Sequence, residues 1–456
     1  MAKRTPAAAV RIDLLRVLDL LHAHITGALC QAEFGRVRTI ERQRVWTLEA
    51  LVQFWTAVIL RAPQALSQAL VDAVEGREPL FPRIQATPEA FFQRCQSLRS
   101  AFFAAVFQAF TARLVPATPP RFAAELAPLR ARFADLLILD GSRLAAIAHR
   151  LKLLWDERAV ILPGCLLAVY DLGRGLCRHL HFSPDAAAGE WTRAKGVLGD
   201  LARDTLVVGD RLYCTAAFFA TLGAPGCFGL ARRNRRLGLK RGQRLRKARH
   251  RGGVLEDWRV TGGAGAAAQP LRWIRWRHGR TCYELLTSVL DPKRLAAAEA
   301  LALYPERWSI ERMYFDLKEV LNLNRVYAAN PNAVAMQAYA GAMVYNAMRV
   351  AQGEVAEAAG RAPEAISPAK FFPKVAAAAY AATLFEAAFL ETQRANPGQR
   401  LRRPPRHRRR FASVSLEAIL VEPRRGPRRR RRFCAARRHW KSLMHVRGAR
   451  KRLKLT

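Results

Sequence analysis

The stretch 136–141 reads Leu-Leu-Ile-Leu-Asp-Gly, a short apolar run that ends in an acid and a glycine. Such a run predicts a buried strand with Asp140 at its end. A second run, 205–210, reads Thr-Leu-Val-Val-Gly-Asp and ends in Asp210 in the same way. A carboxylate at a strand end is a suitable ligand for a hard cation. For each aspartate alone, a capping or turn role is the alternative interpretation.

The segments around these two runs predict a mixed sheet flanked by helices. Residues 161–170 and 176–182 are apolar runs joined by the turn sequence Asp-Leu-Gly-Arg-Gly, which predicts a hairpin. A polar segment compatible with a helix follows at 185–203, residues 282–290 are a further strand candidate, and 295–321 has helical character with a break near Tyr304-Pro305. The predicted fold class is therefore α/β.

Four regions that differ in composition and hydropathy pattern follow one another along the chain. Residues 1–128 carry apolar side chains at helical spacing and are expected to form an all-helical domain. The sheet domain is expected at 129–350, with a β-rich basic insertion at about 215–281 in which residues 231–255 hold eleven Lys and Arg and no acid. A helical segment is predicted at 351–395, and a basic tail, expected to be disordered, at 396–456.

Charge is the outstanding feature of the composition. The 456 residues contain 76 Lys and Arg against 36 Asp and Glu, a formal net charge of +40. Self-repulsion of this size favours a polyanionic partner, so nucleic acid is the leading prediction and an anionic membrane surface the weaker one. The residues from Arg400 onward hold 22 of the bases and two acids, so a DNA-binding tail is favoured over a merely solvated one.

The sequence predicts neither a secreted nor a membrane protein. Its eight cysteines form no CxxC pair and no zinc-type cluster, which indicates reduced thiols in a cytosolic protein. The N-terminus lacks the pattern of a signal peptide and is expected to lead directly into a helix. The most apolar stretch, 333–348, is too short to span a bilayer and is expected to be a buried helix.

The helix near Glu311 carries a group of chemically active side chains on one face. At about 100° per residue, Tyr304, Arg307, Glu311 and Lys318 fall within an arc of about 60°. A solvated face with an Arg307–Glu311 ion pair is the alternative interpretation. Together with Asp140 and Asp210, however, Glu311 completes three carboxylates on separate elements. Such a set can hold two cations roughly 3.5–4 Å apart for phosphodiester chemistry.

These residues resemble the insertion-sequence DDE transposases of the IS-four type. Tyr304-(2)-Arg307-(3)-Glu311-(6)-Lys318 reproduces that family's Tyr-Arg-Glu-Lys signature, and 303–311 resembles its wider string "lY-x-x-RW-x-IE". Asp140, in Leu-Asp-Gly-Ser, resembles the first-aspartate motif. Asp210, followed three residues later by Tyr213, resembles the second. The resemblance covers about 135–350.

The resemblance implies a ribonuclease-H-like catalytic domain and a metal-dependent reaction. Asp140, Asp210 and Glu311 would bind two Mg²⁺, with Mn²⁺ as a substitute. Tyr304, Arg307 and Lys318 would hold phosphates of the transposon end, with Arg211 as a weaker candidate. The β-rich insertion would clamp that end. The helices of 1–128 would recognise the terminal repeats, and the segment after 350 would contact a partner subunit in a homodimeric synaptic complex.

An aromatic side chain is expected to support a base extruded during second-strand cleavage. In relatives with a hairpin intermediate, this aromatic precedes a Thr-Ser pair by four residues, which corresponds to Tyr283 before Thr287-Ser288. Trp273 and Trp276, in the basic insertion, are the competing candidates, and simple packing of Tyr283 in the sheet is the alternative interpretation. Trp308 is expected to lie in the core.

The predicted function is cut-and-paste DNA transposition in the bacterial cytoplasm, in association with the nucleoid. The partners are double-stranded DNA, as transposon ends and as target, with no membrane and no small-molecule substrate. The alternatives are a metal-dependent DNA endonuclease without strand transfer and a domesticated, non-catalytic DNA-binding protein.

Overall fold

The computed structural model describes residues 9–13, 15–37, 45–144, 164–185, 189–328, 330–395 and 411–421. The described residues up to Leu420 belong to one compact unit. Of the second unit, Val421–Thr456, only Val421 lies in the described part of the chain. Most of the predicted basic tail, including the run Arg428–Arg432, therefore lies outside the described residues.

A nine-stranded mixed sheet forms the centre of the fold, with the strand order β4-β3-β2-β5-β6-β10-β9-β8-β7. β2 pairs antiparallel with β3 and parallel with β5, and β5 pairs parallel with β6. The order of the first five strands is consistent with the predicted ribonuclease-H-like arrangement, and the α/β class is confirmed. The strands are β2 (Leu136–Arg143), β3 (Cys165–Asp171), β4 (Leu176–Ser183), β5 (Leu206–Gly209), β6 (Phe228–Arg232), β7 (Leu239–His250), β8 (Gly253–Gly262), β9 (Gln269–His278) and β10 (Thr281–Thr287).

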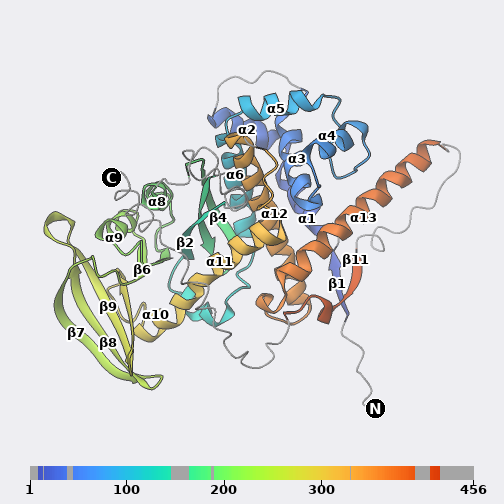
Figure 1. Ribbon diagram of the computed structural model, residues 1–456. Coiled ribbons are helices and arrows are strands. Elements are labelled where there is room, and N and C mark those ends of the chain that lie inside the picture. Colours follow the sequence, from blue (N-terminus) through green and yellow to red (C-terminus); the bar gives the residue numbers. More distant parts are fainter. Residues whose placement is uncertain are drawn as a thin grey trace, which may run out of the picture. The chain divides into compact units, whose positions relative to one another are not determined.

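Helices cover the two faces of this sheet (Figure 1). α8 (Glu190–Leu198) and α9 (Ala216–Gly223) pack on one face, in a cluster with Leu137, Val207 and Trp273. α10 (Ala297–Leu303), α11 (Trp308–Phe315) and α12 (Pro331–Ala358) contribute to the core of the other face. Neighbouring residues of a strand face opposite sides, so β2 supplies Ile138 to one cluster and Leu139 to the other.

The N-terminal region is helical but not wholly so, which corrects the sequence prediction. Ala9–Asp13 forms strand β1, which pairs antiparallel with β11 (Phe411–Ser415) from the predicted tail. The long apolar segment 90–114 is divided by a bend of 83° between α5 and α6. The helices are α1 (Arg16–His24), α2 (Gly27–Val37), α3 (Leu48–Arg61), α4 (Leu66–Glu75), α5 (Pro88–Ser97), α6 (Ala101–Ala117) and α7 (Ala127–Arg130).

α12 unites the N-terminal helices with the sheet. Its residues 333–353 are all buried, which confirms the predicted core helix, and it packs against α3, α6 and β4. Asn346, in the middle of α12, donates to Thr111 of α6 and accepts from the backbone N–H of Cys177 in β4. The predicted domain boundary at 350 therefore falls inside a single helix, because one hydrophobic core extends across it.

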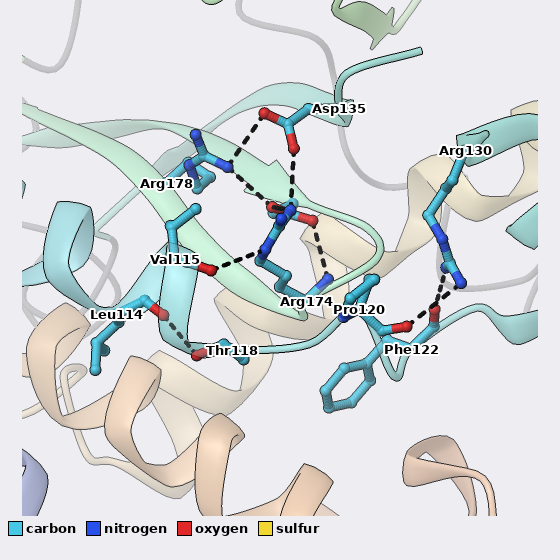
Figure 2. Close-up of polar contacts among 10 residues, drawn as sticks. Leu114, Val115, Thr118, Pro120, Phe122, Arg130, Asp135, Arg174 and Arg178 are labelled. Atoms are coloured by element: carbon cyan, nitrogen blue, oxygen red, sulfur yellow. Dashed lines mark hydrogen bonds and ion pairs between the residues drawn. The ribbon is translucent and has the colours of Figure 1, made fainter. Parts of the chain in front are cut away.

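A charged network near the start of β2 joins the same parts (Figure 2). Arg174, in the β3–β4 turn, donates to the Val115 carbonyl of α6 and to both Asp135 and Asp171. Arg178 of β4 donates to the same two carboxylates. Asp171 is 1% exposed, so without it the two arginines would lose their more buried carboxylate partner and keep only Asp135.

The predicted basic insertion is part of the central sheet and not a separate subdomain. β7, β8 and β9 extend the sheet from β10 to its outer edge. Arg272 of β9 is fully buried, pairs with Asp257 of β8 and donates to the carbonyl groups of Val289 and Leu295. This buried pair fixes the extension to the segment that precedes α10.

The C-terminal part of the described chain contains α13 (Pro368–Ala395) and the short β11 segment. Leu416 and Ile419, just after β11, are buried, so residues 411–421 are not part of a disordered tail. In the described residues, Pro368–Thr392 is long and apolar enough to cross a membrane, and the bent pair α5–α6 would count only as a broken span. One such helix is weak evidence for a membrane span.

Candidate catalytic site

The two predicted aspartates lie side by side on neighbouring parallel strands. β2 and β5 run parallel, and Leu139 pairs with Gly209, so Asp140 and Asp210 are the next residues on neighbouring strands. Asp210 lies just beyond its strand, where its Oδ1 accepts from the backbone N–H groups of Leu212 and Tyr213. Asp210 therefore follows a strand end, as predicted. The prediction for Asp140 is wrong, because β2 continues to Arg143 and Asp140 pairs with Ala168 of β3 inside the strand.

Arg307 connects Asp140 with Glu311. Its Nη1 donates to Asp140 Oδ2 at 3.0 Å, and its Nη2 donates to Glu311 Oε1 at 2.8 Å. The guanidinium is well buried, with its side chain 11% exposed, whereas the Glu311 side chain is 40% exposed. The predicted Arg307–Glu311 ion pair is therefore present, but it is part of a bridge to the sheet and not an isolated surface contact.

Asp140 lies in an environment that opposes its ionisation. Burial raises the pKa of its carboxyl group to about 7, although the backbone N–H of Gly141 and the Arg307 guanidinium favour the charged form. The negative charges of Asp210 and Glu190 raise the pKa further. Tyr314 of α11 donates its hydroxyl to the Asp140 carbonyl at 2.9 Å, which holds the signature helix against β2.

Glu190, at the start of α8, is a fourth carboxylate that the sequence analysis missed. A Cβ atom on Gly141 would lie 1.7 Å from Glu190 Oε1, so the glycine after Asp140 makes room for this side chain. The signal available in the sequence was that glycine, which a strand interior otherwise disfavours.

The signature helix is not regular along its length. Tyr304–Arg307 is a 3₁₀ turn, α11 covers Trp308–Phe315, and Asp316–Val320 is a π turn. Lys318 lies in the π turn and donates to the Ser142 hydroxyl of β2 at 2.7 Å. Burial lowers the pKa of Lys318. Single π turns inside helices are common at functional sites, and here the turn brings Lys318 to the strand that carries Asp140.

Tyr283 and Tyr304 are in contact beside this group. Their rings meet edge-on at 5.8 Å, and the Arg232 guanidinium lies 5.4 Å from the Tyr283 ring. Tyr304 is 5% exposed and Tyr283 is half-buried. Trp276 pairs with Tyr283 across β9 and β10 and packs on the same core, while its Nε1 donates to the His250 carbonyl.

Trp273 is separated from that group. It is 3% exposed and packs in the cluster of α8 and α9, on the other face of the sheet. The structure therefore brings Tyr283 and Trp276 toward the signature helix and leaves Trp273 on the opposite side.

Three exposed side chains border the site. Arg211 and Leu212 follow Asp210, and Leu212 is 68% exposed. The prediction that Trp308 lies in the core is wrong, because Trp308 is 58% exposed. It precedes Ile310 by two positions and so points away from the buried stripe, with the Arg307 guanidinium 4.8 Å from its ring.

The donor chemistry of the site fits a hard divalent cation. Asp140 and Glu311 already share the Arg307 guanidinium. Because burial raises the pKa of Asp140, its charged form needs a strongly positive neighbour, such as a divalent cation. Among the described residues, no three His, Cys, Asp or Glu side chains converge closely enough to hold a metal in their present positions. Cation binding at these acids would therefore require Arg307 to release them.

Comparison with known proteins agrees with this geometry. Residues 163–347 match the family model described as "Transposase DDE domain". The match includes Asp210, Glu311 and the whole Tyr-Arg-Glu-Lys signature, whereas Asp140 lies before its first residue.

A similar protein from Sinorhizobium fredii (strain NBRC 101917 / NGR234) carries the name "Putative transposase y4zB". It is 27% identical over 146 residues, which cover 31% of this chain and 41% of that relative. The chain thus spans less than half of the length of this relative. The two likenesses together support a DDE transposase.

Proposed function

We propose that the protein is a cut-and-paste DNA transposase of an insertion sequence. The observation that carries this proposal is that Asp140 and Asp210 occupy adjacent positions on neighbouring parallel strands, while Arg307 links Asp140 to Glu311. The net charge of +40 supports DNA as the substrate.

Asp140, Asp210 and Glu311 are proposed to hold two Mg²⁺, with Mn²⁺ as a substitute. When bound, such ions activate water and stabilise the charge that develops on a phosphodiester. Gly141 and the N–H groups after Asp210 orient the two aspartates through hydrogen bonds. Tyr314 holds Glu311's helix against the strand that carries Asp140.

Basic and hydroxyl-bearing side chains around the acids are proposed to bind the DNA backbone. Arg307, once it leaves Asp140 and Glu311, presents a planar donor suited to a phosphate. Lys318 and Tyr304 lie on the same helical segment, and Arg211 is exposed beside Asp210. Together they would place a scissile phosphate over the carboxylates.

Tyr283 is proposed to support a base that leaves the stack during second-strand cleavage. Its contact with Tyr304 and its half-buried ring place an aromatic surface beside the signature helix. Trp276, paired with Tyr283, offers a second such surface.

Strand cleavage and joining are the decisive tests. The full chain, incubated with a duplex from the inverted repeats that flank its gene and with a plasmid, is expected to cut the duplex in Mg²⁺ and to join it to the plasmid. Ca²⁺ should support binding without cutting. Cleavage without joining would indicate an endonuclease. Binding without cleavage in either Mg²⁺ or Mn²⁺ would indicate a non-catalytic DNA-binding protein.

The proposed setting is the bacterial cytoplasm at the nucleoid, with a second copy of the chain as partner. Two transposon ends require two active sites, which a homodimer supplies. α13 is the proposed contact, because Leu384, Phe385 and Leu390 are 39–49% exposed on it.

A further inference from the structure

The sheet extension presents different aromatic residues on its two faces. Tyr283 and Trp276 pack toward the core that includes Tyr304. Trp258 of β8 and Trp273 of β9 pair with each other and pack toward α9. Residues 273 and 276 lie three apart on one strand, so the alternation of a strand separates their side chains.

Guanidinium groups gather around the two tryptophans on the α9 side. Arg241 lies 5.8 Å from the Trp258 ring and 5.2 Å from the Trp273 ring, and Arg244 lies 5.5 Å from the Trp258 ring. Arg233 and Arg275 lie 4.7 and 5.5 Å from Trp273. We call this group the Arg–Trp face; it consists of Arg233, Arg241, Arg244, Arg275, Trp258 and Trp273, of which Trp273 is itself buried.

The Arg–Trp face keeps positive charge that its neighbours do not neutralise. Glu284 pairs with Arg233 at 2.9 Å and lies 3.8 Å from Arg275, and Glu256 lies 3.9 Å from Arg275. Arg241 and Arg244, both exposed, form no ion pair with any of the described residues. Guanidinium groups held on aromatic rings are oriented in advance for phosphate oxygens, with little side-chain freedom left to lose.

The catalytic acids belong to the other side of the sheet. Tyr304, Met313 and Tyr314 of the signature segment pack in the same core as Tyr283. A duplex with its scissile phosphate at Asp140 and Glu311 would therefore run along the Tyr283 side. The sheet itself therefore separates that duplex from the Arg–Trp face.

We propose that the Arg–Trp face binds a second duplex, the target DNA, while the opposite face holds the transposon end. This inference rests on the proposed function. Contacts between guanidinium groups and phosphates carry no direct base readout, which suits a target chosen with little sequence preference. A partner copy's transposon end on this face is the competing occupant.

Strand β7 offers two variants with equal charge loss on opposite faces. Arg241 pairs with Val260 and Arg244 with Trp258, both on the α9 side. Lys240 pairs with Thr261 and Arg246 with Asp257, which occupy the alternate positions. All four bases are exposed. The test variant is Arg241→Gln/Arg244→Gln, and the matched control is Lys240→Gln/Arg246→Gln.

A bridging assay in Ca²⁺ tests the proposal without catalysis. Full-length protein is bound to an immobilised end duplex, and the capture of a supercoiled plasmid is measured as plasmid and salt concentrations vary. In the test variant, we expect the plasmid concentration for half capture to rise about tenfold, and the salt slope of capture to fall by about two, at ~0.9 per lost phosphate contact. End binding should stay within about twofold of the wild type.

The control variant should show the reverse, with weaker end binding and unchanged plasmid capture. Equal effects of the two variants on both duplexes, or a wild-type complex that captures no plasmid, would overturn the assignment. Replacing the plasmid with a second end duplex tests the competing occupant: preferential loss of that bridging in the test variant would also overturn it. Failure of the proposed function is seen separately, as absent end cleavage by the wild type in Mg²⁺.

Discussion

Arg307→Gln is expected to make the free protein bind divalent metal more tightly. In the structure, the Arg307 guanidinium occupies Asp140 and Glu311 together, at 3.0 and 2.8 Å. A cation that uses these carboxylates must first displace that guanidinium. Glutamine removes the competing charge and keeps most of the side-chain length.

The size of the increase in metal affinity follows from the more buried of the two Arg307 contacts, the one with Asp140. Asp140 and Arg307 have side chains 16% and 11% exposed, whereas Glu311 is 40% exposed and its contact is discounted for solvent screening. A hydrogen bond to a charged group contributes about 1.5–3 kcal/mol. Removing this competition should therefore tighten Mn²⁺ binding roughly 10- to 150-fold.

The assay is titration of Mn²⁺ into DNA-free protein, followed by electron paramagnetic resonance. It is run at about pH 8.5, above the pKa of Asp140. Arg312→Gln is the matched control, because Arg312 lies on the same helix and contacts Ser309 and Glu306, not the site acids. Asp140→Asn should abolish the tight site in either background.

End-DNA affinity should move in the opposite direction, because Arg307 is a proposed phosphate ligand. Arg307→Gln should thus bind metal more tightly and end DNA more weakly. Mn²⁺ affinity that is equal to or lower than that of the wild type would refute the view that Arg307 competes with the metal.

Three further outcomes are expected. Because the pKa of Asp140 in the folded state is raised to about 7, the free energy of unfolding should fall as pH rises from about 4 to 7. Asp140→Asn should therefore raise the free energy of unfolding by about 1–4 kcal/mol at pH 8 and change it little at pH 4, as measured by urea denaturation. Asp171→Ala leaves Arg174 and Arg178 with Asp135 as their remaining carboxylate partner and should cost about 1.5–3 kcal/mol in the same assay, whereas a loss below ~1 kcal/mol would contradict the network's role. Tyr283→Ala should slow second-strand cleavage roughly 5- to 150-fold and spare first-strand nicking, with 2-aminopurine fluorescence reporting the extruded base.

The basic tail can be tested without disturbing the described fold. Residues 422–456 hold 15 Lys and Arg and one acid, and their deletion spares β11 with the buried Leu416 and Ile419. Binding to all DNA sequences should weaken alike, and the slope of log affinity against log salt should flatten by ~0.9 per lost contact. An unchanged slope would exclude the tail from DNA binding.

Local pattern was sufficient for the elements that carry the acids. Apolar runs of strand length predicted β2, β3, β4, β5 and β10. β3 and β5 are buried along their whole length, which requires apolar side chains on both faces. The position of Asp210 at a strand end followed from the same runs, whereas Asp140 lies inside β2, which continues to Arg143. Helical spacing predicted that Arg307 and Glu311 share a face, and their hydrogen bond shows it.

Contacts between distant segments were decided only by the tertiary structure. The bond from Arg307 to Asp140, the place of Glu190 over Gly141, and the pairing of β1 with β11 join residues far apart in sequence. A hydropathy pattern records which side chains avoid water, but not which partner each one meets.

The two faces of the sheet extension show the same limit most clearly. Alternation along β9 already separates Trp273 from Trp276 in the sequence, because successive side chains of a strand point to opposite sides. Which side meets α9 and which meets the signature helix depends on how β10 pairs with β6 and how the helices pack over the sheet. These long-range contacts are determined by the burial of whole surfaces, and no local stretch of the sequence specifies them.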